Sequence, residues 1–236
     1  MKIESLKFEG VSFTHDGQDP IVQNVDFDFP TKEVLWVKAE EGAGKSSLLQ
    51  ILAGLQIPQS GKYMINGENI LDMSFEEFLP YRLQIGYSFD YGGLINNRTL
   101  HDNLMLPLLY HKMVSPEEAR TRVDGLLKEF GIEKFAQERP AHVPGRVRKL
   151  TCLLRPLVMR PQVLLLDDPS VGLGQDSIYT FVDHINKHRK EGCFNHIFIS
   201  SYDEKFMNHF EYQIIHLDDG QLYFQAVDPE KRVVHL

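Results

Sequence analysis

The amino-acid sequence predicts an α/β fold, in which a core of parallel strands carries a phosphate-binding loop. The first supporting observation is the run Glu41-Gly42-Ala43-Gly44-Lys45-Ser46-Ser47, which lies between an apolar segment at 33–38 and an apolar helical pattern at 46–52. The second is a continuous apolar run at 163–166, followed by Asp167 and Asp168. The third is the alternation of β-branched segments with helical periodicity, which is typical of α/β proteins.

Residues 41–47 have the chemistry of a loop that binds phosphate. Glycines at 42 and 44 let backbone N–H groups approach phosphate oxygens, and the following helix presents its positive end to the same anion. Lys45 can reach the β- and γ-phosphates, and the Ser46 hydroxyl can hold Mg²⁺. One position departs from the usual pattern, because Ala39 stands where the first glycine is expected. An ordinary glycine turn before a helix is the alternative, but the order of strand, loop, lysine and serine favours a phosphate site.

The first third of the chain predicts short strands, and the middle predicts helices. Strands are expected at 3–8, 21–29, 34–37, 62–65 and 85–89, where β-branched and aromatic residues are frequent. Between about 90 and 160 the pattern is helical. Ser115 and Pro116 mark the start of a helix that runs to about Phe130 and stops at Gly131. A further helix is expected at 146–159, which Pro156 should kink or shorten.

The last third returns to strands and helices. The run at 162–166 is expected to be a buried parallel strand, since it is apolar without interruption. A helix at 176–190, a strand at 195–200 and a short helix at 203–210 should follow. Segments 212–216 and 221–224 close the chain as a hairpin around Asp218, Asp219 and Gly220.

The bulk composition excludes several classes of protein. The 236 residues carry a formal net charge of −8, which argues against a dedicated nucleic-acid binder. The two cysteines, Cys152 and Cys193, form neither a metal motif nor a disulfide framework. The N-terminus lacks the apolar core of a signal peptide, and no apolar run is long enough to span a membrane. We therefore expect no direct insertion into the membrane and a reducing compartment.

Taken in order, these motifs resemble those of the ATP-binding cassette ATPases, the motor subunits of ABC transporters. The resemblance covers nearly the whole chain and rests on Gly10-Val11-Ser12-Phe13, on the phosphate loop, on the stretch at 55–61 that ends in Ser60-Gly61, and on the stretch from Arg160 to Pro169. It implies a P-loop NTPase fold of the ABC type, with a RecA-like core, an antiparallel β part and an inserted helical subdomain. One domain would span 1–236, with residues 90–160 inserted into a core formed by 1–89 and 161–236.

The resemblance also implies roles for individual residues. ATP and Mg²⁺ would be bound by residues 42–47 and by Asp167. His15 would contact adenine, and a loop histidine on the surface is the alternative for this residue. Asp90 stands where the family has a glutamine that contacts Mg²⁺, so Asp90 could bind the cation. The family's Leu-Ser-Gly-Gly-Gln signature falls on residues 143–147, where only Gly145 matches; Pro144 and Arg146 replace its serine and a glycine.

The catalytic positions also differ from the family pattern. Asp168 replaces a catalytic glutamate, and Tyr202 replaces a histidine. Asp176 would take the role of a conserved loop aspartate only if two residues are inserted before it. Because the residues that hold phosphate are retained and those that position water are altered, the sequence predicts ATP binding with weak or absent hydrolysis.

The expected function is that of an ATP-binding subunit of a membrane transport complex, located in the cytoplasm at the inner face of a membrane. Its partners would be an integral membrane permease and a second copy of the chain. Two stretches, residues 66–70 and the pair Gly92-Gly93 with the residues up to Leu104, look like those of Mla/Mce-type lipid-transport ATPases. A non-enzymatic scaffold that binds nucleotide and a fully active transport ATPase remain as alternatives.

Overall fold

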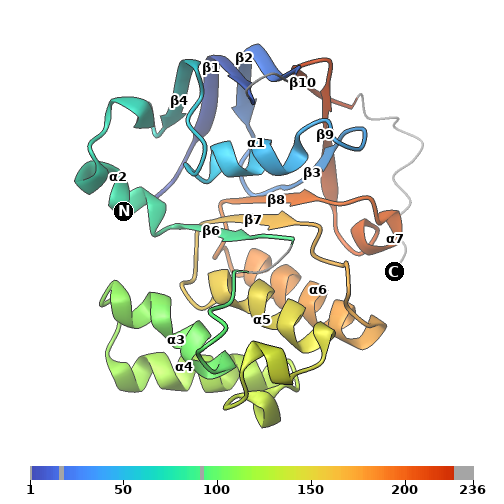
Figure 1. Ribbon diagram of the computed structural model, residues 1–236. Coiled ribbons are helices and arrows are strands. Elements are labelled where there is room, and N and C mark those ends of the chain that lie inside the picture. Colours follow the sequence, from blue (N-terminus) through green and yellow to red (C-terminus); the bar gives the residue numbers. More distant parts are fainter. Residues whose placement is uncertain (1, 16–18, 91–92, 226–236) are drawn as a thin grey trace.

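A computed structural model describes residues 2–15, 19–90 and 93–225 of the chain. Gly92, which belongs to one of the stretches compared above with lipid-transport ATPases, lies outside these ranges. Two β-sheets and a group of helices make up the described part of the molecule (Figure 1). This α/β architecture is the fold class that the sequence predicted.

The larger sheet has six strands in the order β10-β9-β3-β8-β7-β6. Strands β9, β3, β8, β7 and β6 are parallel, and β10 closes the edge as an antiparallel hairpin with β9. Because the carboxyl ends of parallel strands meet at one edge, the loops that follow β3, β6, β7 and β8 lie near one another. The bounds are β3 Val34–Lys38, β6 Ile85–Ser88, β7 Val163–Asp167, β8 His196–Ser200, β9 Tyr212–Asp218 and β10 Gln221–Phe224.

Both faces of this sheet are buried, which explains why its strands read as continuous apolar runs. Along β3, Val34 and Trp36 point into one hydrophobic core, whereas Leu35 and Val37 point into the other. The same period of two divides the apolar residues of β7 and β8 between the cores. A sheet covered on two faces needs two covering layers, and the rest of the chain supplies them.

One layer combines a second sheet with helix α1. The second sheet is antiparallel and has the strand order β2-β1-β4-β5. In Figure 1, α1 lies between the two sheets, and its Leu48, Leu49 and Leu52 belong to the core that they share. The bounds are β1 Leu6–Thr14, β2 Pro20–Phe29, β4 Ser60–Ile65, β5 Glu68–Asn69 and α1 Lys45–Leu52.

The other layer is helical. Helices α3, α5 and α6 pack on the opposite face of the six-stranded sheet, and α4 packs against α3 (Figure 1). The helices α3, α4 and α5 come from the region expected to form an inserted subdomain; its limits at 90 and 160, and the single domain over 1–236, stay predictions. The bounds are α2 Phe75–Arg82, α3 Leu100–Tyr110, α4 Pro116–Glu129, α5 Gly145–Leu157, α6 Gln175–Lys190 and α7 Glu204–Met207, with short 3-10 turns at Ile70–Asp72, Glu133–Phe135 and Pro140–His142.

Local signals set most helix ends. The Ser115 hydroxyl accepts the Glu118 N–H at 3.2 Å, so α4 begins where the sequence predicted. Helix α5 ends at Leu157, one residue after Pro156 and earlier than the expected 159, because proline removes one backbone donor from the last turn. The sequence analysis did not predict α2 as a helix, although Ser74 and Glu77 form a capping box at its start.

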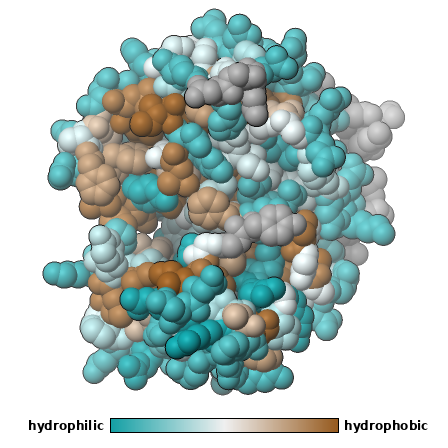
Figure 2. Space-filling view, viewed as in Figure 1, coloured by the Kyte–Doolittle hydropathy of each residue, from teal (hydrophilic) through white to brown (hydrophobic). Residues whose placement is uncertain are grey.

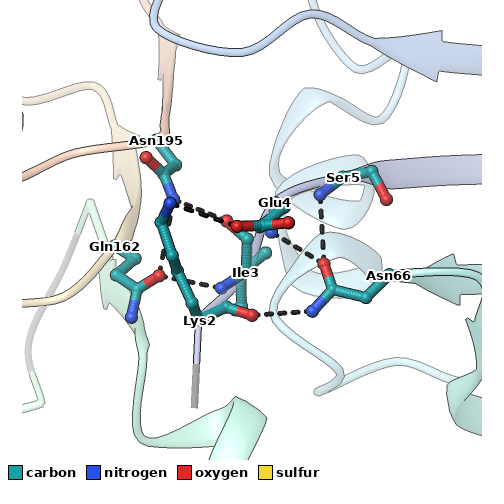
Figure 3. Close-up of polar contacts among 7 residues, drawn as sticks. All are labelled: Lys2, Ile3, Glu4, Ser5, Asn66, Gln162 and Asn195. Atoms are coloured by element: carbon teal, nitrogen blue, oxygen red, sulfur yellow. Dashed lines mark hydrogen bonds and ion pairs between the residues drawn. The ribbon is translucent and has the colours of Figure 1, made fainter.

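The beginning of the chain is fixed to the amino ends of β7 and β8 (Figure 3). The Gln162 side chain accepts the Ile3 N–H at 2.8 Å, and the Asn195 side chain donates to the Ile3 carbonyl at 2.6 Å. Asn66, in the turn between β4 and β5, accepts the Glu4 N–H at 2.7 Å. These amides join both sheets at the end of the molecule opposite the phosphate loop, and Asn66 therefore has a structural role.

Large apolar side chains are exposed around α2 and α3. Phe75 at the start of α2 is 73% exposed and Tyr110 at the end of α3 is 76% exposed, with Leu109 beside it. Figure 2 shows hydrophobic side chains on both sides of a hollow between the parts of the surface formed by these two helices. Exposed apolar patches rimmed by polar residues mark contact sites for partners. Within the described ranges, no helix is both long and apolar enough to cross a bilayer.

His196 at the start of β8 predicts a loss of stability in acid. The ring is fully buried, Nδ1 donates to the Pro30 carbonyl at 3.1 Å, and burial lowers the pKa from 6.5 to about 4. The unfolded chain therefore binds a proton more readily, and stability present above pH 6.5 is lost as pH falls toward 4. Urea denaturation at pH 7 and pH 4.5 should show His196→Phe losing about 2–3 kcal/mol less than the native chain. Equal losses would contradict the assignment.

Candidate nucleotide site

The phosphate loop joins β3 to α1, and its backbone requires glycine. Gly42 has φ 81° and Gly44 has φ 97°, a region that side chains disfavour. A Cβ at Gly44 would also lie 2.5 Å from the Ile21 side chain. Gly44 caps α1 without a side-chain hydrogen bond, so the first N–H groups of the helix face outward at its positive end. This geometry fits an anion at the residues predicted to bind phosphate.

Lys45 and Tyr202, which are distant in sequence, lie in direct contact. Lys45 is 7% exposed, and its Nζ lies 3.5 Å from the centroid of the Tyr202 ring, a cation–π contact. The Tyr202 hydroxyl donates to the Glu40 carbonyl at 3.4 Å. The phenol ring therefore covers one side of the ammonium that the sequence assigned to phosphate.

Asp167, the last residue of β7, is buried and held by two hydroxyl groups. Ser200 Oγ donates to Oδ1 at 2.5 Å, and the Tyr87 hydroxyl donates to Oδ2 at 3.3 Å. Burial, followed by the nearby charge of Asp167, raises the pKa of Tyr87, which keeps that phenol protonated and donating. Each carboxylate oxygen retains a second lone pair, and hard oxygen ligands are those that Mg²⁺ prefers. Asp167 together with the exposed Ser46 hydroxyl thus has the donor chemistry of a magnesium site.

Asp168 follows β7 in a left-handed conformation, with φ 42°. Its N–H donates to the Ser200 carbonyl at 3.0 Å, which fixes the turn. Burial, followed by the charges of Asp167 and Asp90, raises the pKa of the Asp168 carboxyl. A carboxylate with a raised pKa is better suited to accept a proton than an ordinary aspartate. It lines a cavity of about 350 Å³ with Ser170, Val171, Ser201, Tyr202 and Asp203.

Lys149 is a member of the site that the sequence analysis missed. Its side chain comes from α5, is 9% exposed and contacts the segments after β6 and β7 through Asp90 and Asp168. Lys149 could have been found from the sequence, because it lies four residues before Leu153 and therefore on the buried face of an amphipathic helix. Asp90 is thus engaged with a cation of the protein itself.

The comparisons with known proteins establish the family. A protein-family model described as "ABC transporter" matches residues 22–171, which include the phosphate loop and Asp167. The chain belongs to the ABC transporter family. The resemblance to ABC transporter ATPases that the sequence motifs indicated is therefore confirmed. The family is one whose ATP-binding subunits bind ATP, typically with Mg²⁺.

Several relatives of this ABC transporter family chain align with it over almost its full length. The Cell division ATP-binding protein FtsE of Escherichia coli (strain K12) is 28% identical, over 92% of this chain and 97% of that protein. The Methionine import ATP-binding protein MetN of Chromohalobacter salexigens is 30% identical, over 94% of this chain and 64% of that protein. The dimeric ATP-binding cassette MJ0796, solved in a post-hydrolysis state with ADP and Pi, is 25% identical with a TM-score of 0.82, over 92% of this chain and 96% of that chain.

The remaining residues that the family resemblance singled out lie in two places. His15 lies beside α1, with Nε2 3.0 Å from the Ser47 hydroxyl and its ring edge-on to Phe13. Pro144, Gly145 and Arg146 form the exposed amino end of α5. None of these three residues lines the cavity beside Asp168.

Asp176 lies in the first turn of α6 and is exposed. The loop before it contains Gly172 and Gly174, and Gly172 has φ 78°. A carboxylate in the first turn stabilises the positive end of a helix, which gives Asp176 a structural role in any case. Its assignment to the loop aspartate of the family stays a prediction.

Proposed function

We propose that this chain is the ATP-binding subunit of an ABC-type membrane complex and binds Mg-ATP through residues 42–47 and Asp167. The observation that carries the proposal is the placement of Lys45, at the positive end of α1, next to the carboxyl edge of β7. The backbone N–H groups and Lys45 would hold the phosphates. Ser46 and Asp167 would hold Mg²⁺, which supplies charge neutralisation of the phosphates when bound. His15, beside Ser47, would face the base.

We further propose that hydrolysis is weak. Asp168 has one methylene less than the glutamate of the family, and a misplacement of about 1 Å can cost on the order of 10²-fold in rate. Tyr202 replaces the imidazole of the family's histidine, the side chain that is suited to proton exchange near neutral pH. Asp90 replaces a glutamine, and Pro144 and Arg146 alter the signature. Asp168 and Tyr202 would then act as a weakened base and phosphate contact.

The partner proposed is an integral membrane permease, bound by a homodimer of this chain at the inner face of a membrane. The exposed apolar side chains around α2 and α3 support a protein partner (Figure 2). The name of MetN, a methionine import ATP-binding protein, supports a role in transport, and the dimeric structure of MJ0796 supports a dimer. Lipid handling is proposed on sequence resemblance alone. A nucleotide-binding scaffold without turnover and an active transport ATPase are the alternatives, and the number of ATP molecules hydrolysed separates all three.

ATP binding and phosphate release by the purified chain test this proposal. Saturating Mg-ATP should stabilise the chain by roughly 2–4 kcal/mol, measured as a rise in the midpoint of thermal unfolding. Phosphate release should stay far below 10 s⁻¹, about the median turnover of enzymes. No thermal shift would contradict ATP binding, and turnover near 10 s⁻¹ would show an active ATPase.

Asp168→Glu should raise phosphate release about tenfold. The longer side chain restores the missing reach, although the left-handed backbone suits aspartate better than glutamate and limits the gain. Asp183→Glu is the matched control, because it adds the same methylene to an exposed aspartate of α6 that has no proposed role in the site. If both variants release phosphate at the native rate, the reach of residue 168 does not limit hydrolysis.

A further inference from the structure

Lys149 makes three polar contacts and joins three segments of the chain. Its ammonium donates to the Asp90 carbonyl at 3.0 Å, to Asp90 Oδ1 at 3.2 Å and to the Asp168 carbonyl at 2.9 Å. A lysine ammonium has three donors, so all of them are used. The side chain is 9% exposed, and a buried charge is retained only when such partners satisfy it.

These contacts lie at the carboxyl edge of the six-stranded sheet. Strands β6 and β7 are parallel neighbours, with Ser88 opposite Leu166, so the residues that follow them emerge side by side. Asp90 follows β6 and Asp168 follows β7, and Lys149 on α5 holds both. The Asp168 backbone is left-handed and strained, and the hydrogen bond from Lys149 to the Asp168 carbonyl helps to hold it in that conformation.

A second cation of α5 holds the same segment after β6. The Arg155 guanidinium donates to the Gly93 carbonyl, and a Cβ at Gly93 would collide with that guanidinium. Arg155 and Lys149 therefore hold residues 90 and 93 from one helix. Helix α5, which carries Pro144, Gly145 and Arg146 at its amino end, is thus held by two charged side chains to the segments that follow β6 and β7.

The ion pair with Lys149 also limits the ability of Asp90 to bind a metal ion. Asp90, Asp167 and Asp168 interact electrostatically at this edge, and Lys45 and Lys149 oppose their charge. A metal ion bound to Asp90 would lie beside the Lys149 ammonium, which is 3.2 Å from Asp90 Oδ1, and repulsion between the two cations disfavours that position. Asp167 has no such constraint, because its partners are neutral hydroxyl groups.

We propose that Lys149 is a positioning residue for the nucleotide site: it anchors α5 to the ends of β6 and β7 and keeps Asp90 out of Mg²⁺ coordination. The role in Mg²⁺ binding rests on the proposed function. The anchoring role does not, because it concerns contacts within the nucleotide-free chain. Asp90 is then part of a structural ion pair rather than a metal ligand, unlike the glutamine that the family places there.

Four variants of the full chain test the proposal: Lys149→Gln, Lys149→Arg, Asp90→Asn and the double variant Lys149→Gln with Asp90→Asn. Without nucleotide, Lys149→Gln should lower the unfolding temperature more than the double variant does, since only the single variant leaves a carboxylate unpaired. With a fluorescent ATP analogue, the Mg²⁺ concentration at half-saturation should fall about threefold to tenfold in Lys149→Gln. It should return to within twofold of native in the double variant and in Lys149→Arg.

Two results would overturn the proposal. Additive effects of the two single substitutions on unfolding temperature would show that Lys149 and Asp90 are not coupled, whether or not the chain binds ATP. If Asp90→Asn alone raised the half-saturating Mg²⁺ concentration as much as Asp167→Asn, Asp90 would be a metal ligand. Failure of the native chain to bind the ATP analogue would instead contradict the proposed function. The unfolding temperatures of the four variants, measured without nucleotide, would still decide the anchoring role.

Discussion

Lys45→Ala is expected to lower the affinity for Mg-ATP about 100-fold, which corresponds to ~2.8 kcal/mol. The ammonium is the positive side chain of the phosphate loop, and hydrogen bonds to charged groups contribute roughly 1.5–3 kcal/mol each. The variant also frees Tyr202, whose ring covers Lys45 Nζ at 3.5 Å. The measured loss of affinity therefore includes the loss of this cation–π contact as well as the loss of the phosphate contact. Titration with a fluorescent ATP analogue measures the affinity.

Lys38→Ala is the matched control for this experiment. Lys38 also lies over an aromatic ring, with Nζ 3.8 Å from the Trp36 centroid, and it forms an ion pair with Glu204. Its removal eliminates a lysine and a cation–π contact at the end of β3 without removing the lysine of the loop. An ATP affinity of Lys45→Ala within threefold of the Lys38→Ala value would mean that Lys45 does not bind phosphate.

Trp36→Ala is expected to destabilise the chain by about 4 kcal/mol, the middle of the range for removing a large buried aromatic. Trp36 is 2% exposed, packs edge-on against Tyr212 at 5.0 Å and donates from Nε1 to the Ser201 carbonyl at 2.9 Å. The substitution leaves both a cavity and a buried carbonyl without its donor. For a chain of this size the unfolding temperature should fall by roughly 8–16 °C.

Trp36→Phe separates packing from hydrogen bonding. Phenylalanine keeps the larger part of the aromatic volume but loses the pyrrole part of the indole with its Nε1 donor, so its cost should be about 2 kcal/mol. Since Ser201 precedes Tyr202, both variants should also loosen the contact between Tyr202 and Lys45. Urea denaturation compares the two variants directly. Equal losses for Trp36→Ala and Trp36→Phe would show that the hydrogen bond, rather than packing, accounts for the effect.

The sequence located the phosphate-binding part of the candidate site because that part is local. Residues 41–47, together with a strand before and a helix after them, contain every group needed to predict an anion at a helix end. The apolar run before Asp167 likewise predicted a buried strand, and β7 is Val163–Asp167. The helix at α2 was missed, since its apolar pattern is weak and Pro80 lies inside it.

Contacts between distant segments could not be derived in this way. Lys149 and Asp90 are separated by 59 residues, and Trp36 and Ser201 by 165, so no local pattern connects them. The strand order places β8 between β3 and β7, and it places β6 beside β7, although three helices separate β6 from β7 along the chain. This order brings the residues after four strands to one edge, where they interact.

The sequence by itself determined the family, the phosphate loop and the substitutions at Asp168 and Tyr202, because these depend on residue types at fixed spacing. Only the tertiary structure decided how those residues are paired. It placed the Tyr202 ring over Lys45 and engaged Asp90 with Lys149. The physical reason is that a charged side chain buried at the edge of a sheet requires a partner, and the packing of helices α1 and α5 against the ordered strands determines which partner is within reach.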